Sequence, residues 1–238
     1  RQKCRLEIYI GMINNKYNII HFKTIDSTNN ELYKMATNGA DEWTIIIADE
    51  QTKGKGRLGR SFESPANTGL YMSILLKPTL VIEKSVFITV AAASAMSKSI
   101  EKVFGKKAYI KWVNDIYMDG KKVSGILTEA SFGLEDGSLD YVVLGIGINA
   151  YPPAEGFPKE LQATGDTIHP MFIQIAGAVF QERQNDGKNR LAAAFLNYFM
   201  EDYTAGKIED HVKKYRERSL VIGKEITVLS SNGQERAL

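Results

Sequence analysis

The sequence lacks several features that would narrow its function. One cysteine, Cys4, among 238 residues excludes an intrachain disulfide and a zinc site built on several cysteines. The three histidines, His21, His169 and His211, are scattered along the chain. No apolar run approaches the roughly 20 residues of a membrane span, and the N-terminus has no signal-peptide pattern. We therefore expect a cytoplasmic protein with no membrane partner.

Strong net charge is also absent. The chain has 30 Lys and Arg against 28 Asp and Glu, which gives +2 at pH 7, so its composition gives no reason to expect DNA as a partner. Cations gather instead in one glycine-rich stretch, residues 53–60, which contains no acid. Its three glycines and four cations are Gly54, Gly56, Gly59, Lys53, Lys55, Arg57 and Arg60.

This basic loop has the composition of an anion-binding site. Glycine lets the backbone approach a ligand closely, and successive N–H groups with nearby cations attract negative charge. Residues 54–59 match both G-x-G-x-x-G and the glycines of a Walker A loop. Both motifs need a helix to follow, whereas residues 61–69 are rich in turn formers. We predict an anion-binding loop of another kind, and a solvated basic turn is the alternative.

A polar cluster precedes the first predicted helix. Thr28 and Glu31 have the spacing of a capping box, and the helix is expected to end at Gly39. Ser27 and Thr28 therefore have two interpretations: they cap the helix, or they bind a polar ligand at its N-terminus. This stretch alone favours capping.

Two further strands carry unusual residues. Alternation in 109–113 places Lys111 among apolar neighbours, which is costly unless the lysine is paired, meets a ligand or lies on an edge strand. Gly145 and Gly147 share one face of the strand 141–149, where they leave a trough for a flat group or for a closely packed helix.

The order of elements predicts an α+β fold with a mixed, mostly antiparallel sheet flanked by helices. Residues 1–217 are expected to form one domain, and 218–238 to begin a truncated C-terminal one. Strands are predicted at 18–23, 43–49, 70–76, 109–113, 116–118, 123–129, 141–149 and 220–229. Helices are predicted at 28–38, 85–104, 169–183, 188–204 and 208–217.

Four segments in this order resemble the biotin protein ligase family. They are Asp26-Ser27-Thr28-Asn29, residues 51–60 (close to GRGRxGR), Lys111-Trp112-Val113-Asn114-Asp115 (KWPND) and Gly145-Ile146-Gly147-Ile148-Asn149 (GxGIN). The resemblance implies the fold shared by class II aminoacyl-tRNA synthetases and biotin ligases, followed by an SH3-like domain. Because no helix-turn-helix domain fits before residue 18, it indicates the monofunctional type without DNA binding, or a fragment of a longer ligase.

The resemblance implies a role for each matching residue. The ureido end of biotin would meet Ser27, Thr28, Asn29 and Gln51, and its carboxylate would meet Lys55, Gly56, Arg57 and Lys111. ATP or the adenylate would meet Arg57, Arg60, Lys111 and Asn149. Lys111 and Arg57 would be catalytic, and Asn114 or Asp115 would help to place Mg²⁺.

The implied reaction has two steps: biotin and ATP form biotinyl-5′-AMP, and a lysine of a biotin carboxyl carrier protein then displaces AMP. Whether the protein forms a homodimer is left undecided by the sequence. Three departures stand out: Lys55 replaces an arginine, Val113 replaces a proline, and residues 162–166 look shorter than the family's Ala-Thr-Ser-Leu region. The alternatives are a lipoate or octanoate ligase or transferase and a non-enzymatic phosphate or nucleic-acid binding module.

Overall fold

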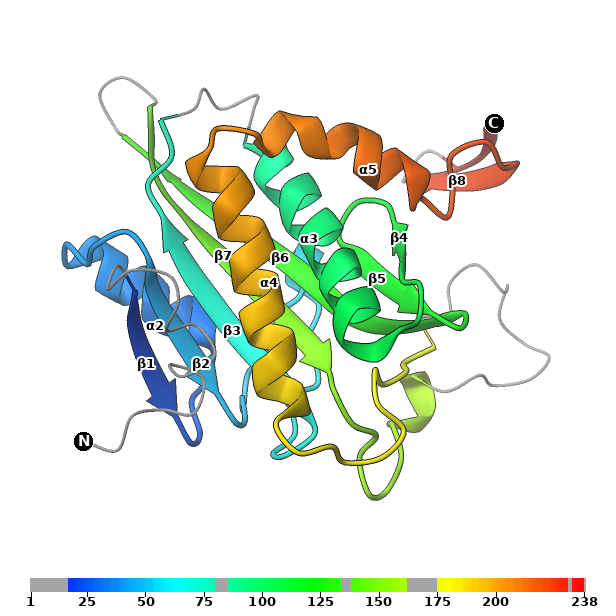
Figure 1. Ribbon diagram of the computed structural model, residues 1–238. Coiled ribbons are helices and arrows are strands. Elements are labelled where there is room, and N and C mark those ends of the chain that lie inside the picture. Colours follow the sequence, from blue (N-terminus) through cyan, green and yellow to red (C-terminus); the bar gives the residue numbers. More distant parts are fainter. Residues whose placement is uncertain (1–16, 80–84, 134–137, 162–174, 231–232, 238) are drawn as a thin grey trace.

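A seven-stranded sheet forms the centre of this computed structural model (Figure 1). Its strand order is β1-β2-β3-β7-β6-β5-β4, and every neighbouring pair is antiparallel except β1 with β2. The predicted α+β fold with a mixed, mostly antiparallel sheet is thereby confirmed. The strands are β1 (Asn18–Phe22), β2 (Thr44–Ala48), β3 (Gly69–Leu76), β4 (Tyr109–Lys111), β5 (Asp115–Met118), β6 (Lys121–Phe132) and β7 (Leu139–Asn149). The structure describes residues 17–79, 85–133, 138–161, 175–230 and 233–237.

Helices cover the two faces of the sheet unequally. In Figure 1, α3 (Val86–Phe104), α4 (Gly187–Thr204) and α5 (His211–Glu217) lie over one face, where the larger apolar core forms. On the opposite face, α2 (Thr28–Thr37) packs on β2, β3 and β7 through a small apolar cluster. The short 3₁₀ turns are η1 (Arg57–Gly59), η3 (Lys159–Leu161) and η4 (Ile208–Asp210). α2 leaves part of this second face uncovered, over β6 and β7. Side chains on this uncovered part can meet a ligand.

Small residues lie side by side on this second face. In the register between β6 and β7, Gly125 lies opposite Gly147 and Leu127 lies opposite Gly145. The neighbouring strand places Asp115 opposite Gly125. Because side chains alternate across a strand, these positions form two adjacent rows on one face, in which Gly125, Gly145 and Gly147 leave room beside Asp115 and Leu127.

The capping box at the start of α2 was a wrong prediction. Ser27 is the residue that precedes the helix, and it makes no side-chain cap hydrogen bond. The backbone N–H of Thr28 donates instead to Gln51 Oε1 at 2.8 Å, and the Thr28 hydroxyl donates to the same oxygen at 3.0 Å. The free N–H at the helix start is thus satisfied from outside the helix, which leaves the local capping pattern unused.

The helix predicted at 169–183 is also not observed in its described part. Residues 169–174 lie outside the described ranges, and the following segment runs beside the sheet. Lys122 N donates to Ile175 O at 2.7 Å, and Gly177 N donates to Lys122 O at 2.8 Å. A Cβ at Gly177 would lie 2.6 Å from Lys121 Cβ. The segment bonds to the sheet because glycine permits this close approach.

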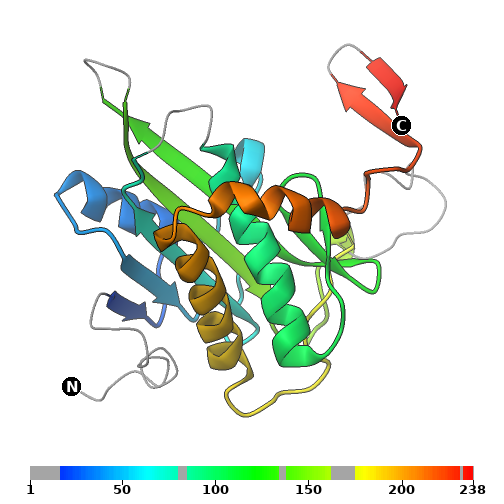
Figure 2. The same ribbon diagram turned by 45° about the horizontal axis from the view of Figure 1, so that its top comes forward.

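The C-terminal hairpin projects beyond α5 (Figure 2). It consists of β8 (Ile226–Ser230) and β9 (Gly233–Ala237), paired antiparallel. The segment before the hairpin pairs with the edge strand β4. Ile110 N donates to Arg218 O, and Leu220 N donates to Ile110 O, each at 2.8 Å. The SH3-like character and the domain division at 217 stay predictions. Within the described ranges, no helix combines the length and apolarity needed to cross a bilayer.

Candidate active site

A cavity of about 720 Å³ opens on the sheet face beside the start of α2. This volume lies within the usual range of small-molecule sites. Every predicted site residue except Asn149 lines it, although the segments that carry these residues are spread over almost 90 positions of the sequence. The predicted residues that the cavity brings together are Ser27, Thr28, Asn29, Gln51, Lys55, Gly56, Arg57, Arg60, Lys111, Asn114 and Asp115.

The lining of this cavity is strongly cationic. It contains five cations, whereas Asp115 is the one carboxylate among the described lining residues. Several fixed cations around one concave site raise the local potential for anions. The cavity can therefore hold two negatively charged groups close together. The five cations are Lys55, Arg57, Arg60, Lys111 and Lys122.

Protein side chains fill the glycine trough on β7. A Cβ at Gly145 would lie 2.1 Å from Asn29 Oδ1, and one at Gly147 would lie 2.5 Å from the Phe62 ring. Asn29 belongs to α2, so the alternative of a closely packed helix is confirmed at Gly145, whereas Phe62 occupies the trough at Gly147. Asn29 and Phe62 pack against the strand at these glycines, and both also line the cavity.

The basic loop forms a small hairpin. Lys55 bridges to Ser61, and Gly56 N donates to Arg60 O at 2.7 Å. This N–H is thus bonded within the loop, which reduces the expected set of free N–H donors. Leu58 occupies the tip with φ +56°, and its side chain is 91% exposed. As predicted, no helix follows the loop, because β3 comes next.

Two side-chain contacts hold the basic loop against the sheet. Lys55 Nζ donates to Glu129 Oε1 at 2.6 Å, and Arg57 donates through Nη1 to Asn114 Oδ1 at 3.3 Å. Arg57 therefore spans the mouth of the cavity from the loop to the turn after β4. Both contacts are solvent-exposed.

The strand predicted at 109–113 ends at Lys111, so Trp112 does not lie in a strand as expected. β4 stops at Lys111, so Trp112 lies in a turn, lines the same cavity and is 63% exposed. Lys111 Nζ lies 5.7 Å from the centre of the Tyr117 ring. Burial raises the pKa of Tyr117 to about 12, and the charge of Asp115 adds to the shift. Tyr117 therefore stays a neutral phenol at pH 7.

Lys122 is a site residue that the sequence interpretation missed. Its side chain is 18% exposed, and Nζ lies 2.7 Å from Asp115 Oδ1. The turn at Asp119 and Gly120 pairs Tyr117 with Lys122, which places this lysine on the ligand side of the sheet. The hairpin register could have revealed it, but two adjacent lysines after a turn look like solvated residues.

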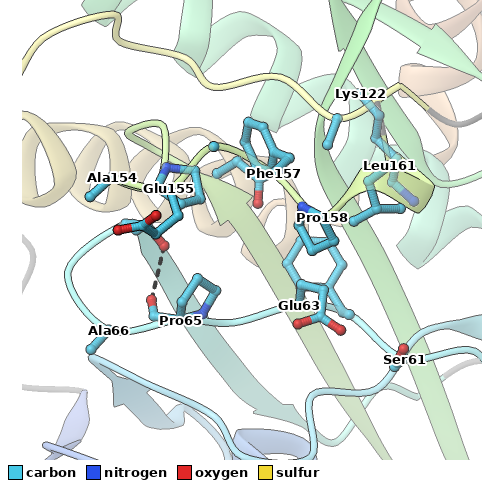
Figure 3. Close-up of a pocket in the computed structure, with 16 residues that line it drawn as sticks. Ser61, Glu63, Pro65, Ala66, Lys122, Ala154, Glu155, Phe157, Pro158 and Leu161 are labelled. Carbon is cyan, nitrogen blue, oxygen red and sulfur yellow. Dashed lines mark hydrogen bonds between the residues drawn. The ribbon is translucent and has the colours of Figure 1, made fainter. Parts of the chain in front are cut away.

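A second cavity, of about 740 Å³, adjoins the first (Figure 3). Asn149 lines this cavity and not the first one. Ser61, Phe62 and Lys122 line both cavities, so Lys122 lies at the boundary between them. Apolar side chains make up much of the remaining wall, among them Pro65, Phe157, Pro158 and Leu161.

The segment after α5 supplies an apolar wall that the sequence interpretation also missed. Leu220 and Val221 line the first cavity. Arg218 fastens this segment: Nη1 donates to Ser97 Oγ at 3.1 Å and to Ala108 O at 3.3 Å, and Nη2 pairs with Glu101. These partners are more than 100 residues away, so no local pattern could have indicated the contact.

The residues predicted to place Mg²⁺ have other partners here. Asp115 pairs with Lys122, while Asn114 receives Arg57 on Oδ1 and donates through Nδ2 to Ile126 O at 2.9 Å. No cluster of three or more His, Cys, Asp or Glu suited to a metal occurs in the described part of the chain. Mg²⁺ commonly uses one or two carboxylates together with substrate phosphates. Asp115 fits that limited role, and Mg²⁺ stays a prediction.

Comparison with known proteins decides the family. Residues 21–149 match the model of the biotin/lipoate A/B protein ligase family, which is more than half of the chain. The chain belongs to this family. The biotin–[acetyl-CoA-carboxylase] ligase of Paracoccus denitrificans is 32% identical over 171 residues, 67% of this chain and 70% of that protein. The bifunctional ligase/repressor BirA of Bacillus spizizenii is 37% identical over 177 residues, 71% of this chain and 54% of that protein.

Solved structures show the same fold. The biotin protein ligase of Aquifex aeolicus in complex with biotin and ATP aligns with a TM-score of 0.65 at 24% identity, over 93% of this chain and 95% of that one. This chain spans about half the length of the Bacillus relatives that it matches. The matched family region contains the polar cluster, the basic loop and both lysines, but ends before Leu220 and Val221.

Proposed function

We propose that this protein is an ATP-dependent biotin protein ligase. It would join biotin to ATP as biotinyl-5′-AMP and then transfer biotin to a lysine of a biotin carboxyl carrier protein. The observation that carries the proposal is the pair of adjoining cavities with Lys122 on the boundary between them. One cavity is polar at one end and cationic, whereas the other has a largely apolar wall with one amide side chain, Asn149, and two carboxylates, Glu63 and Glu155. These are the surroundings that a vitamin carboxylate and a nucleotide require.

Biotin would occupy the first cavity. Its uncharged ureido group would lie at the polar end, near Ser27, Thr28 and Gln51. The ring and tail would contact apolar side chains of the same lining, of which Trp112 and Leu220 are the candidates. The carboxylate would then point towards the basic loop and the two lysines.

ATP would place its adenine in the second cavity and its phosphates at the boundary. Asn149 would recognise the base edge, since a side-chain amide offers both a donor and an acceptor. Phe157 and Leu161 lie in the same cavity (Figure 3) and would pack on the adenine. Arg60 and Lys122 would meet the phosphates, and Mg²⁺ would enter with them, next to Asp115.

The first step joins two anions. A biotin carboxylate oxygen attacks the α-phosphorus, a new P–O bond forms, and the bond to pyrophosphate breaks. The barrier contains the repulsion between the reactants, and fixed cations in a desolvated site lower it because they need no reorganisation. Holding both reactants in adjoining cavities also reduces the entropic part of the barrier.

Two lysines are candidates to bridge the carboxylate and the α-phosphate. Lys111 is the residue that the family resemblance indicates. Lys122 is better placed by geometry, since it lines both cavities. In the second step the carrier lysine would attack the acyl carbon and AMP would leave, while Arg57 would retain the adenylate until then.

Exchange of labelled pyrophosphate into ATP tests the first step directly. Exchange that requires biotin supports the proposal, and folded protein that gives no exchange with biotin and Mg²⁺ contradicts it. The lipoate alternative falls within the same family, so lipoate and octanoate belong in the same assay. Stabilisation of the fold by lipoate but not by biotin would favour that alternative.

A simple phosphate or nucleic-acid binding module makes a different prediction. Its affinity would fall steeply as salt rises, because counterions are released when phosphates bind. It would also bind ATP without any turnover. The pyrophosphate exchange assay therefore separates this alternative from both ligase activities.

A further inference from the structure

A continuous chain of polar side chains lies beneath the first cavity. It begins at Lys55 in the basic loop, crosses the sheet face, and returns to Ser64, just beyond the same loop. We call it the floor network. Its members, in order of contact, are Lys55, Glu129, Asn29, Ser73, Thr28, Gln51 and Ser64.

Glu129 is the member that joins two separate parts of the fold. Its Oε1 accepts from Lys55 Nζ at 2.6 Å, and its Oε2 accepts from Asn29 Nδ2 at 2.8 Å. The two partners lie 74 and 100 residues from Glu129 in the sequence. One carboxylate thus connects the middle of the basic loop to the start of α2.

The other half of the network fixes the orientation of the polar groups. An ionised carboxylate only accepts hydrogen bonds, so Glu129 directs the amide nitrogen of Asn29 towards itself. Asn29 Oδ1 then faces Ser73 Oγ at 2.5 Å, and this hydroxyl also lies 2.7 Å from Thr28 Oγ1. Asn29 has little room to rotate, since it is buried against Gly145.

The network closes on the far end of the loop. Gln51 Oε1 accepts from Thr28, and its Nε2 donates to Ser64 Oγ at 2.9 Å. Ser64 Oγ in turn donates to Phe62 O at 2.9 Å. Lys55 within the basic loop, and the segments directly before and after that loop, are thus all tied to the polar end of the cavity.

We infer that Glu129 is a positioning residue that couples the basic loop to the polar end of the ligand cavity. This inference rests on the proposed function, since the ligand at that end is biotin. Glu129 lines neither of the two main cavities, so it acts through Lys55 and Asn29. It therefore controls biotin binding and leaves ATP binding in the adjoining cavity unchanged.

Three variants test this coupling: Glu129→Gln, Lys55→Met and the two combined. We expect each single variant to weaken biotin binding about tenfold, which corresponds to about 1.4 kcal/mol, as measured by titration calorimetry. The double variant should be no weaker than about tenfold, because residues in one network give non-additive effects. The KM for ATP in pyrophosphate exchange should stay within about twofold of the wild-type value.

Amide hydrogen exchange of the ligand-free protein gives a readout that does not depend on biotin. Loss of Glu129 should speed the exchange of residues 53–60 and leave that of α3 and α4 unchanged. Asp119→Asn is the matched control: its carboxylate lies in the β5–β6 turn and pairs with Lys106 at 2.8 Å, and both side chains are more than half exposed. This control should change neither biotin affinity nor loop exchange.

The possible results are distinct. Wild-type biotin affinity and wild-type loop exchange in Glu129→Gln would overturn the inference, and so would effects of the two single variants that multiply in the double variant. Wild-type protein that binds no biotin would instead overturn the proposed function. The hydrogen exchange of the loop alone would then decide whether Glu129 anchors it.

Discussion

Two lysines face the candidate active site from β4 and β6, the strands on either side of β5, and their surroundings differ. Lys111, at the end of β4, lies over the ring of Tyr117 on one side of the first cavity. Lys122, near the start of β6, is mostly buried, pairs with Asp115 and borders both cavities. A lysine at the boundary can touch both reactants at once, whereas a lysine on one wall reaches the second reactant only after a movement.

The two lysines allow the sequence motif that surrounds a residue to be compared with the position of that residue in the fold. Lys111 was found because it stands in a recognisable segment of five residues, and Lys122 was missed because it follows an ordinary turn. A charged group acts on the reaction through its location and its desolvation. We therefore expect position to decide which lysine contributes more to catalysis.

The largest effect should follow from Lys122→Ala. We expect pyrophosphate exchange to fall roughly 10²–10³-fold, the range seen when one fixed donor to a developing charge is removed. Lys111→Ala should cost less, because this lysine lines one cavity only. Steady-state exchange rates at saturating biotin and ATP measure both variants.

The neighbouring lysine supplies the control for this comparison. Lys121 is exposed and lines neither main cavity, so Lys121→Ala should exchange pyrophosphate like the wild type. If Lys111→Ala proves more damaging than Lys122→Ala, the assignment from the motif is right and the argument from geometry fails.

The next effect concerns the retention of the adenylate. Arg57→Gly removes the contact with Asn114 across the cavity mouth. We expect release of biotinyl-5′-AMP to rise about tenfold, a loss of about 1.4 kcal/mol, which is within the range of one charged hydrogen bond. Biotin labelling of a bystander protein that lacks a carrier domain measures the leak, and labelling confined to the carrier would refute the retention role.

A smaller effect is expected at the segment after α5. Arg218→Met should reduce the free energy of unfolding by roughly 1–2 kcal/mol through the lost charged hydrogen bonds. It should also raise the KM for biotin several-fold, since Leu220 and Val221 lose their anchor at the cavity wall. Denaturant unfolding and exchange kinetics measure the two effects. An unchanged KM despite lower stability would show that this segment contributes to the fold and not to the site.

The smallest effect is a pH dependence at His211 in α5, which lines neither main cavity. Burial lowers the pKa of His211, although Asp202, whose Oδ2 lies 2.7 Å from Nε2, opposes the shift. Lys214 and Lys98 lower it further. The folded state thus binds fewer protons, so stability is full above the unfolded pKa of about 6.5 and falls as pH drops below it.

The variant His211→Gln isolates this contribution. The loss of wild-type stability between pH 7.5 and pH 5.5 should exceed that of the variant by about 1 kcal/mol, because one pKa unit corresponds to about 1.4 kcal/mol. Denaturant unfolding at both pH values gives the difference. A wild type that gains stability at pH 5.5 relative to the variant would mean that the attraction of Asp202 outweighs burial.

Local patterns explain what the sequence could predict. The apolar stripe of α3, the β-branched run of β2 and the glycines of the basic loop each depend on neighbours in the chain. They were enough for the fold class and for most elements, whereas the lining of the main cavity was predicted from the resemblance of four segments to the biotin protein ligase family. The helix expected at 169–183 failed in its described part because bonds to the sheet outweighed local propensity.

Contacts between distant segments explain the rest. Glu129 meets Lys55 and Asn29, and Arg218 meets Ser97, across 74 to 121 residues. No spacing in the sequence encodes such pairs. The capping box failed for the same reason, since the side chain that satisfies the start of α2 comes from Gln51.

Biotin-dependent pyrophosphate exchange is the most direct test of the central claim, with Lys122→Ala and Lys121→Ala measured beside the wild type. The account predicts that wild-type exchange requires biotin, persists in Lys121→Ala and is nearly lost in Lys122→Ala. Full exchange in Lys122→Ala would contradict the claim that the boundary between the two cavities is where the carboxylate meets ATP.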